Sequence, residues 1–371
     1  MIEGFINLST PLKRLGFVKV ILWLTHPSSF MYSSQLVLKY KEVVKENRKR
    51  FEWNIDPDTN QVIPGSGIGD ETLPATEDSI AMDHVLLAQS LGFLRKEVNI
   101  WWRFGWHLAS QYAGDKGKPV FMDSEKREEL MMRKGLIAKL PRSEQFIFCN
   151  ALLSSDVDGS IPLIECLEED SIAELRKKYF DSVSNWYARK AEFETNPTRR
   201  YFYLKEKSNF AKSETEGGYS KIHRESQILP RLNFLLDVGF VIKNKSRYSL
   251  SDPAREFKKR VLSLSDNDLF ALLQEKENNL GILLSEYYND RLDKVTSEQF
   301  EEIFYKLSAF YKYIGLIMIP YEDLYFSMTA YALAKSKNLD FSTYRLELEH
   351  LAKRRSFYLS TTVPGRKYIK P

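Results

Sequence analysis

The side chains best suited to chemistry in this chain gather at the start of one expected helix, residues 221–238. They carry ammonium, imidazole, guanidinium and amide groups, which are the groups that contact phosphate oxygens and base edges. These residues are Lys221, His223, Arg224 and Gln227, with Arg231 further along the same helix. Their types predict contacts with nucleic acid rather than catalysis.

Two further sets of basic residues flank this helix in the sequence. One set follows it in a short turn and consists of Lys243, Lys245 and Arg247. The other precedes it and mixes cations with aromatic residues: Arg199, Arg200, Lys205, Lys207 and Lys212 with Tyr201, Phe202 and Tyr203. Basic residues outnumber acidic ones between positions 199 and 247, which favours a nucleic-acid surface. The alternative is that these charges are only the solvated side of an ordinary domain.

Catalytic and metal-binding patterns are weak in this sequence. The five histidines are scattered, and none has a Cys or Asp partner at a metal-binding spacing. The glycine-rich segment 65–69 lacks the Lys-Ser/Thr pair of a phosphate loop. The Glu-x-Lys at 256–258 falls in an expected helix, and the acidic segment 156–160 lacks the closing glutamate of a calcium loop. We therefore expect a protein that is not an enzyme and that has no metal and no cofactor.

Length and composition indicate a folded protein of two or three domains, since 371 residues with 43% hydrophobic side chains can bury several cores. The net charge is only +4, so a nucleic-acid surface must be a local patch. Cys149 and Cys166 are too few for a disulfide framework and indicate a reducing compartment. The apolar run 15–24 is interrupted by Lys19 and is too short to span a bilayer. We expect it to be a buried strand or helix in a cytoplasmic protein that does not contact membranes.

The elements that must position the basic residues are clearest around Gly239. An amphipathic helix is expected to end there, because glycine adopts the left-handed conformation without a Cβ penalty. An apolar strand starts at once, the basic turn follows, and a second strand returns through Tyr248-Ser249-Leu250. Pro253 then opens the next helix at a position where its missing N–H costs nothing.

The same order of helix, glycine and strand recurs in weaker form at Gly92 and Gly315. An aromatic residue follows Gly239 and Gly92 after nine residues and Gly315 after ten. The spacing predicts return strands at 101–104 and 325–328. The alternative is an ordinary helix followed by a β-hairpin in some α+β domain.

Residues 219–260 resemble the C-terminal half of a prokaryotic winged helix-turn-helix domain, and the regions around Gly92 and Gly315 resemble it more loosely. The resemblance implies that the helix at 221–238 presents its first residues to the major groove and that the basic turn is a wing beside it. It is specific for fold and poor for function, because winged helices also serve as protein docking modules.

The expected fold is therefore mainly α (α+β), with several winged-helix domains joined by helical segments. The expected segments are an N-terminal helical or strand segment at 1–53, a loop or linker at 54–78, a winged-helix unit at 79–115, a helical domain at 116–195, a winged-helix domain at 196–262, and a C-terminal helical domain with a further winged-helix unit at 263–371. At the start of the winged-helix domain at 196–262, residues 195–222 are expected to be loop-like, with a short aromatic strand at 201–204.

The function expected from this fold is non-catalytic binding of double-stranded DNA. By analogy with other multi-winged-helix proteins, the chain would be the DNA-engaging or scaffold subunit of a prokaryotic defence, restriction, mobile-element or replication assembly, with other protein subunits as partners. One alternative is a winged-helix docking subunit that does not contact DNA. The other is a nuclease whose metal site has diverged.

Overall fold

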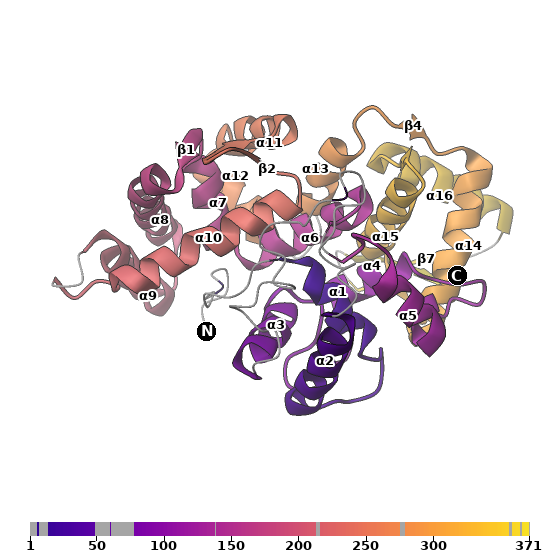
Figure 1. Ribbon diagram of the computed structural model, residues 1–371. Helices are drawn as coiled ribbons and strands as arrows, with labels where there is room; N and C mark the ends of the chain where they lie inside the picture. Colours follow the sequence, from indigo (N-terminus) through magenta and orange to yellow (C-terminus); the bar gives the residue numbers. More distant parts are fainter. Residues whose placement is uncertain are drawn as a thin grey trace. The chain divides into compact units, whose positions relative to one another are not determined.

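The chain divides into two compact units, which are described in turn. The computed structural model describes residues 6, 14–48, 60, 78–137, 139–212, 216–274, 279–355, 358–363 and 366–370. Unit 1 consists of residues 1–14 and 151–275, and unit 2 of residues 15–150 and 276–371. Both are built mainly of α-helices with small sheets, which confirms the mainly α expectation (Figure 1).

Unit 1 contains a run of helices around one small sheet. Its described elements are α7 (Val157–Cys166), β1 (Glu169–Ser171), α8 (Ile172–Phe193), α9 (Pro197–Ala211), α10 (Lys221–Asp237), β2 (Val241–Asn244), β3 (Arg247–Leu250), α11 (Asp252–Leu262) and α12 (Asp266–Gln274). A reciprocal capping box of Ser171 and Glu174 starts α8. Asn196 caps α9, and Pro197 follows it in the first turn. These two helices pack against each other as a helical hairpin.

The sheet of unit 1 has the strand order β1-β3-β2. All its pairs are antiparallel, with Asp170 opposite Tyr248 and Ile242 opposite Ser249. Gly239 has a φ of +76°, and the amide of Phe240 donates to Leu235 O over 2.8 Å, so glycine ends α10 as expected. The predicted order of helix, glycine, strand, short basic turn and strand is confirmed, and the turn consists of two residues.

The core of unit 1 lies where α7, α8, α10 and α11 meet. Trp186 and Tyr179 of α8, Leu232 and Leu235 of α10 and Phe257 of α11 are all at most 1% exposed. Each such side chain contributes about 1.5–3 kcal/mol relative to exposure to water. This packing gives the sheet and its hairpin a rigid base.

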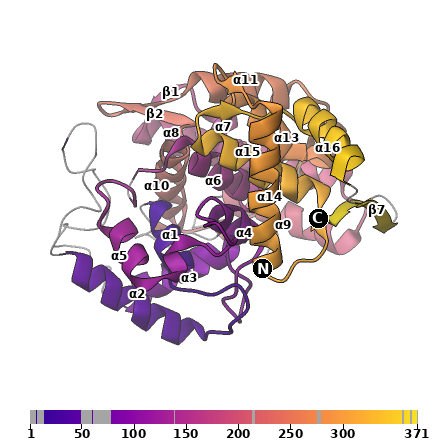
Figure 2. The same ribbon diagram turned by 90° about the vertical axis from the view of Figure 1, so that its right-hand side faces the viewer.

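Unit 2 is larger and also mainly helical. Its described elements are α1 (Gly16–Trp23), α2 (Ser33–Arg48), α3 (Asp78–Ser90), α4 (Arg103–Ser110), the 3₁₀ helix η2 (Val120–Met122), α5 (Ser124–Met132), α6 (Arg142–Ser155, which runs on into unit 1), α13 (Asn279–Tyr288), β4 (Asp293–Lys294), α14 (Ser297–Tyr313), β5 (Ile319–Pro320), α15 (Tyr321–Ala334), β6 (Lys337–Asn338), α16 (Phe341–Arg355), β7 (Tyr358–Val363) and β8 (Arg366–Lys370). Helices α14 and α15 pack side by side (Figure 2). The strands form a parallel pair, β4-β6, and a sheet of order β5-β8-β7. At the C-terminal end of the described residues, β7 and β8 pair antiparallel.

The return strand predicted after Gly315 is wrong. Residues 325–328 lie inside α15, where twelve of fourteen residues are buried. A helix enclosed on all sides has no polar face, so its aromatic run resembled a strand in the sequence.

The strand predicted after Gly92 is wrong from Arg103 onward. Trp101 forms only an isolated bridge with Leu94, and α4 begins at Arg103.

The loop and short strand predicted between residues 195 and 222 are also corrected. Residues 201–204 lie in the middle of α9. The side chain of Asn196 accepts hydrogen bonds from the amides of Thr198 and Arg199, at 3.0 and 3.2 Å. This cap and the proline after it start a helix, and they outweigh the β-propensity of the four consecutive aromatic and apolar residues at 201–204.

The apolar run near the N-terminus forms α1, so the helical alternative of the prediction is the observed one. All eight residues of α1 are buried, including Lys19. Lys19 is paired with Glu144 at 2.6 Å, which explains how a lysine fits an apolar segment. None of the described helices combines the length and the apolar character that a membrane crossing requires.

Candidate nucleic-acid interface

Arg231, predicted to contact DNA, is instead the centre of a buried ionic cluster. Its side chain is fully buried, and its Nε and Nη2 donate to the two carboxylate oxygens of Asp156, each over 2.7 Å. Nη2 also donates to Ile6 O, and Nη1 donates to the carbonyl and side-chain oxygens of Gln227. All five N–H donors of the guanidinium are therefore used inside unit 1.

The electrostatics of this cluster keep Arg231 charged. Burial is the largest single effect and would lower the pKa of Arg231, but the charge and hydrogen bond of Asp156, together with Tyr179 and Tyr187, outweigh it, and the pKa is raised. Gly159 makes room for the guanidinium, because a Cβ at that position would lie 2.2 Å from Arg231 Nε. The cluster ties α10 to the start of α7.

Gln227 shares this buried position, so the prediction that Gln227 and Arg231 contact DNA is corrected. Gln227 is 1% exposed, and its side-chain oxygen accepts from Arg231 over 3.0 Å. The helical spacing of four residues places both on the same face of α10, and that face packs into unit 1. A base edge or a phosphate has no path to either side chain.

The other predicted residues of α10 stand at its first turn. The backbone of α10 begins at Lys221, as expected. The side chains of Lys221, His223 and Arg224 lie outside the described residues. The segment before them is anchored, because the Tyr219 amide donates to Asn209 O over 3.0 Å. The start of α10 therefore adjoins the last turns of α9.

The hairpin of β2 and β3 presents the cations predicted for the turn. Lys243, Lys245 and Arg247 are all exposed. Lys245 stands in the two-residue turn with a φ of +54°, and Lys243 Nζ lies 5.4 Å from the centre of the Tyr248 ring. Neither lysine has an ion-pair partner in the described part of the chain. Their charges are free to meet an anion.

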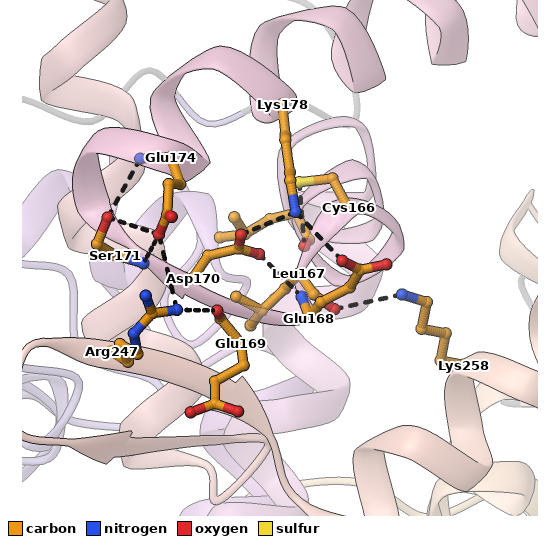
Figure 3. A network of polar contacts seen from close by, with 11 residues as sticks. Cys166, Leu167, Glu168, Glu169, Asp170, Ser171, Glu174, Lys178, Arg247 and Lys258 are labelled. Atoms are coloured by element: carbon orange, nitrogen blue, oxygen red, sulfur yellow. Dashed lines mark hydrogen bonds and ion pairs between the residues drawn. The ribbon is translucent and has the colours of Figure 1, made fainter.

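Arg247 has a structural role in the same hairpin. Figure 3 shows its guanidinium turned toward β1 and the start of α8. It donates to Glu169 O over 2.8 Å and lies 3.9 Å from the Glu174 carboxylate. Beside Glu169 on β1, Asp170 accepts a hydrogen bond from Lys178 of α8 over 2.8 Å. These contacts hold β1 against β3 and so fix the direction of the hairpin.

Helix α9 carries the upstream predicted residues on an open surface. Arg199 and Arg200 are exposed, as are Lys205, Lys207 and Lys212. The single acidic residue between 196 and 212 is Glu206, which is 5% exposed and accepts hydrogen bonds from Asn209 and Tyr219. The cationic side chains of α9 therefore face solvent, and its one carboxylate faces the interior of unit 1.

The local charge balance favours an anionic partner for this part of unit 1. Residues 199–247 hold eleven Lys and Arg against five Asp and Glu, a net charge of +6 where the entire chain has +4. Three of the charged residues in the segment, Arg231, Glu206 and Asp237, are buried. The remaining surface is strongly basic.

Two acidic residues that resembled a calcium loop serve a different purpose. Asp156 binds Arg231, and Asp158 accepts from Lys190 Nζ over 2.8 Å and from Trp186 Nε1 over 2.7 Å. Both carboxylates are buried and neutralise buried cations. Among the described residues, no group of three or more His, Cys, Asp or Glu side chains could hold a metal ion.

Unit 2 contains a serine, histidine and aspartate in contact, which the sequence did not suggest. His107 Nδ1 lies 2.8 Å from Ser327 Oγ, and His107 Nε2 lies 3.5 Å from Asp323 Oδ1. Ser327 also bonds to Tyr311, and Arg103 donates to Asp323 over 3.1 Å. His107 and Ser327 are fully buried, so a substrate cannot reach them. In this arrangement the cluster ties α4 to α14 and α15.

Electrostatics agree with a structural role for this cluster. Burial, with the charge of Arg103, lowers the pKa of His107 more than Asp323 raises it, which favours the neutral imidazole. Burial alone would raise the pKa of Asp323, but the contacts with His107 and Arg103 hold it at about 2. The carboxylate therefore remains charged and paired with the guanidinium of Arg103.

Comparisons with protein-family models, with curated proteins and with solved structures find no match to this chain.

Proposed function

We propose that unit 1 binds double-stranded DNA and that the hairpin of β2 and β3 acts as a wing beside the groove. The observation that carries the proposal is the pair Lys243 and Lys245, exposed and without ion pairs in the described part of the chain, on a hairpin held by a third strand. Phosphate oxygens are the natural partners of such cations. The elements follow in the order α7, β1, α8, α9, α10 and the hairpin of β2 and β3, and the sheet has the strand order β1-β3-β2. This order supports a winged-helix interpretation.

The rigidity of the hairpin supports this role further. Lys245 stands in the two-residue turn, Lys243 lies on β2 just before it, and β3 is paired on both sides. A backbone that is already ordered loses little entropy on binding. The hairpin base is packed through Tyr248, which is 2% exposed. The cations are therefore presented in a defined direction before DNA arrives.

The proposed role in the cell is that of a non-catalytic DNA-engaging or scaffold subunit in a larger prokaryotic assembly. Unit 2 supports this role, since it adds a second folded body larger than a DNA-binding module requires. The buried Ser327, His107 and Asp323 are consistent with structural work in that body.

The experiment that tests DNA binding is the salt dependence of affinity for a labelled mixed-sequence duplex, measured by fluorescence anisotropy. We expect affinity to fall steeply between about 50 and about 200 mM salt, because phosphate contacts release counterions. The double variant Lys243→Ala/Lys245→Ala removes two phosphate contacts, so the slope of log K against log salt should fall by about 2.

A matched control removes two exposed cations that have no proposed contact, in the variant Lys177→Ala/Lys116→Ala. It loses the same net charge and should keep the wild-type slope. If the wild-type protein shows no salt-dependent affinity for the duplex, the DNA proposal is wrong and docking to protein becomes the better interpretation. If the control and hairpin variants behave alike, the hairpin is not the contact.

A further inference from the structure

The exposed side of α9 has an ordered arrangement of charges. At about 100° per residue, its exposed side chains from Arg200 onward cover an arc of about 160°. In order around the helix they are Lys207, Arg200, Ala211, Leu204, Tyr201, Lys212 and Lys205, with the half-exposed Ser208 between Leu204 and Tyr201. The half-exposed Phe202, Tyr203 and Asn209 lie outside this arc. The opposite side carries Glu206 and Phe210, which are buried.

Cations form both edges of this arc, and uncharged side chains form its centre. Arg200 and Lys207 are seven residues apart and share one edge, while Lys205 and Lys212, also seven apart, share the other. Between them stand Tyr201, which is 70% exposed, and Leu204, which is 46% exposed. None of the four cations has an ion-pair partner among the described residues.

We propose that α9 lies in the major groove of the bound duplex, with its two cationic edges on the two phosphate backbones and Tyr201 and Leu204 facing the base edges. The inference rests on the proposed DNA binding and deepens it. The major groove is about 12 Å wide and admits a helix of about 10–12 Å diameter, so the cations of both edges reach phosphates at once. A tyrosine hydroxyl can bond to base edges, and a leucine can contact a thymine methyl group.

The position of α9 relative to the rest of unit 1 agrees with this assignment. Its last turns adjoin the start of α10, where the rings of Phe210 and Tyr219 meet edge to face at 5.0 Å between ring centres. The buried face of α10 holds Gln227 and Arg231, so α10 cannot offer those side chains to a groove. The open, acid-free surface belongs to α9.

An anionic membrane is the other surface that basic edges with an apolar centre could suit. Membrane helices of this type bind in proportion to the apolar area that they insert. The centre of α9 offers only two large side chains, Tyr201 and Leu204, beside the small Ser208 and Ala211. This small apolar area favours DNA.

The test places a photocrosslinker on the centre of α9. The variant Tyr201→Cys is labelled with a cysteine-reactive aryl azide, and Lys177→Cys on α8 is the matched control. Cys149 and Cys166 should react slowly with the reagent, because burial raises the pKa of both thiols to about 12. The probes are a mixed-sequence duplex and the same duplex with glucosylated hydroxymethylcytosine, whose sugar fills the major groove.

We expect the label at position 201 to crosslink to the plain duplex in higher yield than the control label. On the groove-filled duplex the yield at position 201 should fall at least about tenfold, and the yield of the control label should fall less. In parallel, Arg200→Ala/Lys207→Ala should lower the salt slope by about 2, since one edge of phosphates is lost.

Three results would overturn the proposal. If the protein binds the plain duplex but the label at position 201 does not crosslink, α9 is not in the groove and the DNA-binding proposal stands alone. If the wild-type protein does not bind the duplex, both proposals fall. If Tyr201→Ala/Leu204→Ala abolishes binding to phosphatidylserine vesicles and leaves duplex binding intact, the surface belongs to a membrane.

Discussion

Helices α9 and α10 carry the same kinds of residue and place them in opposite environments. Both are rich in cations: α9 with its C-terminal cap residue carries five Lys and Arg from Arg199 to Lys212, and α10 carries three from Lys221 to Arg231. In α10, Arg231 is fully buried and pairs with Asp156, whereas in α9 Arg199 and Arg200 face solvent. The comparison separates two uses of arginine: one holds a fold together, and the other remains available to a partner.

The difference comes from the carboxylates around each helix. Asp156 stands at the start of α7 and meets Arg231 across a separation of 75 residues. The one acidic residue of α9, Glu206, is turned inward to Tyr219. A cation becomes structural where the fold delivers a buried anion to it, and composition along one helix does not reveal that.

The largest expected effect tests the buried half of this comparison. Replacing Arg231 with alanine leaves the Asp156 carboxylate buried and unpaired, which should cost about 3–5 kcal/mol of the free energy of unfolding. Arg200→Ala on α9 should change it by no more than about 0.5 kcal/mol. Urea denaturation followed by circular dichroism measures both.

The double variant Asp156→Ala/Arg231→Ala is the control for the unpaired charge. It removes both charges and should recover part of the loss, because no charge is left buried alone. Equal stability of Arg231→Ala and Arg200→Ala would show that Arg231 does not stabilise the fold. The proposed difference between the arginines of α9 and α10 would then be wrong.

A smaller effect is expected at Gly159, which faces the same guanidinium. A Cβ there would lie 2.2 Å from Arg231 Nε, so Gly159→Ala must displace the guanidinium and should cost about 1–3 kcal/mol. Thermal unfolding measures this cost. In the Asp156→Ala/Arg231→Ala background the obstacle is gone, and the cost should shrink. An undiminished cost there would mean that the glycine is required for its backbone and not for the arginine.

Local sequence signals were sufficient where a structure depends on neighbouring residues. The junction at Gly239, the hairpin after it and the proline-started α11 follow from residues within a few positions of one another. The cations of the hairpin are exposed as expected: Lys245 stands in the turn, and Lys243 and Arg247 lie beside it on β2 and β3. Their contact with DNA remains a prediction.

Long-range pairing explains what the sequence could not reveal. Strand β1 was missed because its three residues are polar and become a strand only by pairing with β3, 78 residues away along the chain. His107 and Ser327 meet across 220 residues, and no spacing rule reports such a contact. The strand predicted at 325–328 failed because burial of α15 on every side removed the polar positions that mark a helix.

The smallest expected effect tests whether α9 itself is the part that matters for DNA. Asn196 caps α9, and Asn196→Ala should cost about 1 kcal/mol while loosening the turn that holds Arg199 and Arg200. Thr296 caps α14 in unit 2 with a similar exposed side chain, so Thr296→Ala should cost a similar amount of stability without changing duplex affinity.

Unfolding curves measure the stability of both variants, and fluorescence anisotropy measures their duplex affinity. A loss of affinity several-fold larger for Asn196→Ala than for Thr296→Ala locates the contact on α9, whereas equal losses would mean that stability alone sets the affinity. Because the stability costs are matched, the difference in affinity depends only on which helix lies against the phosphates.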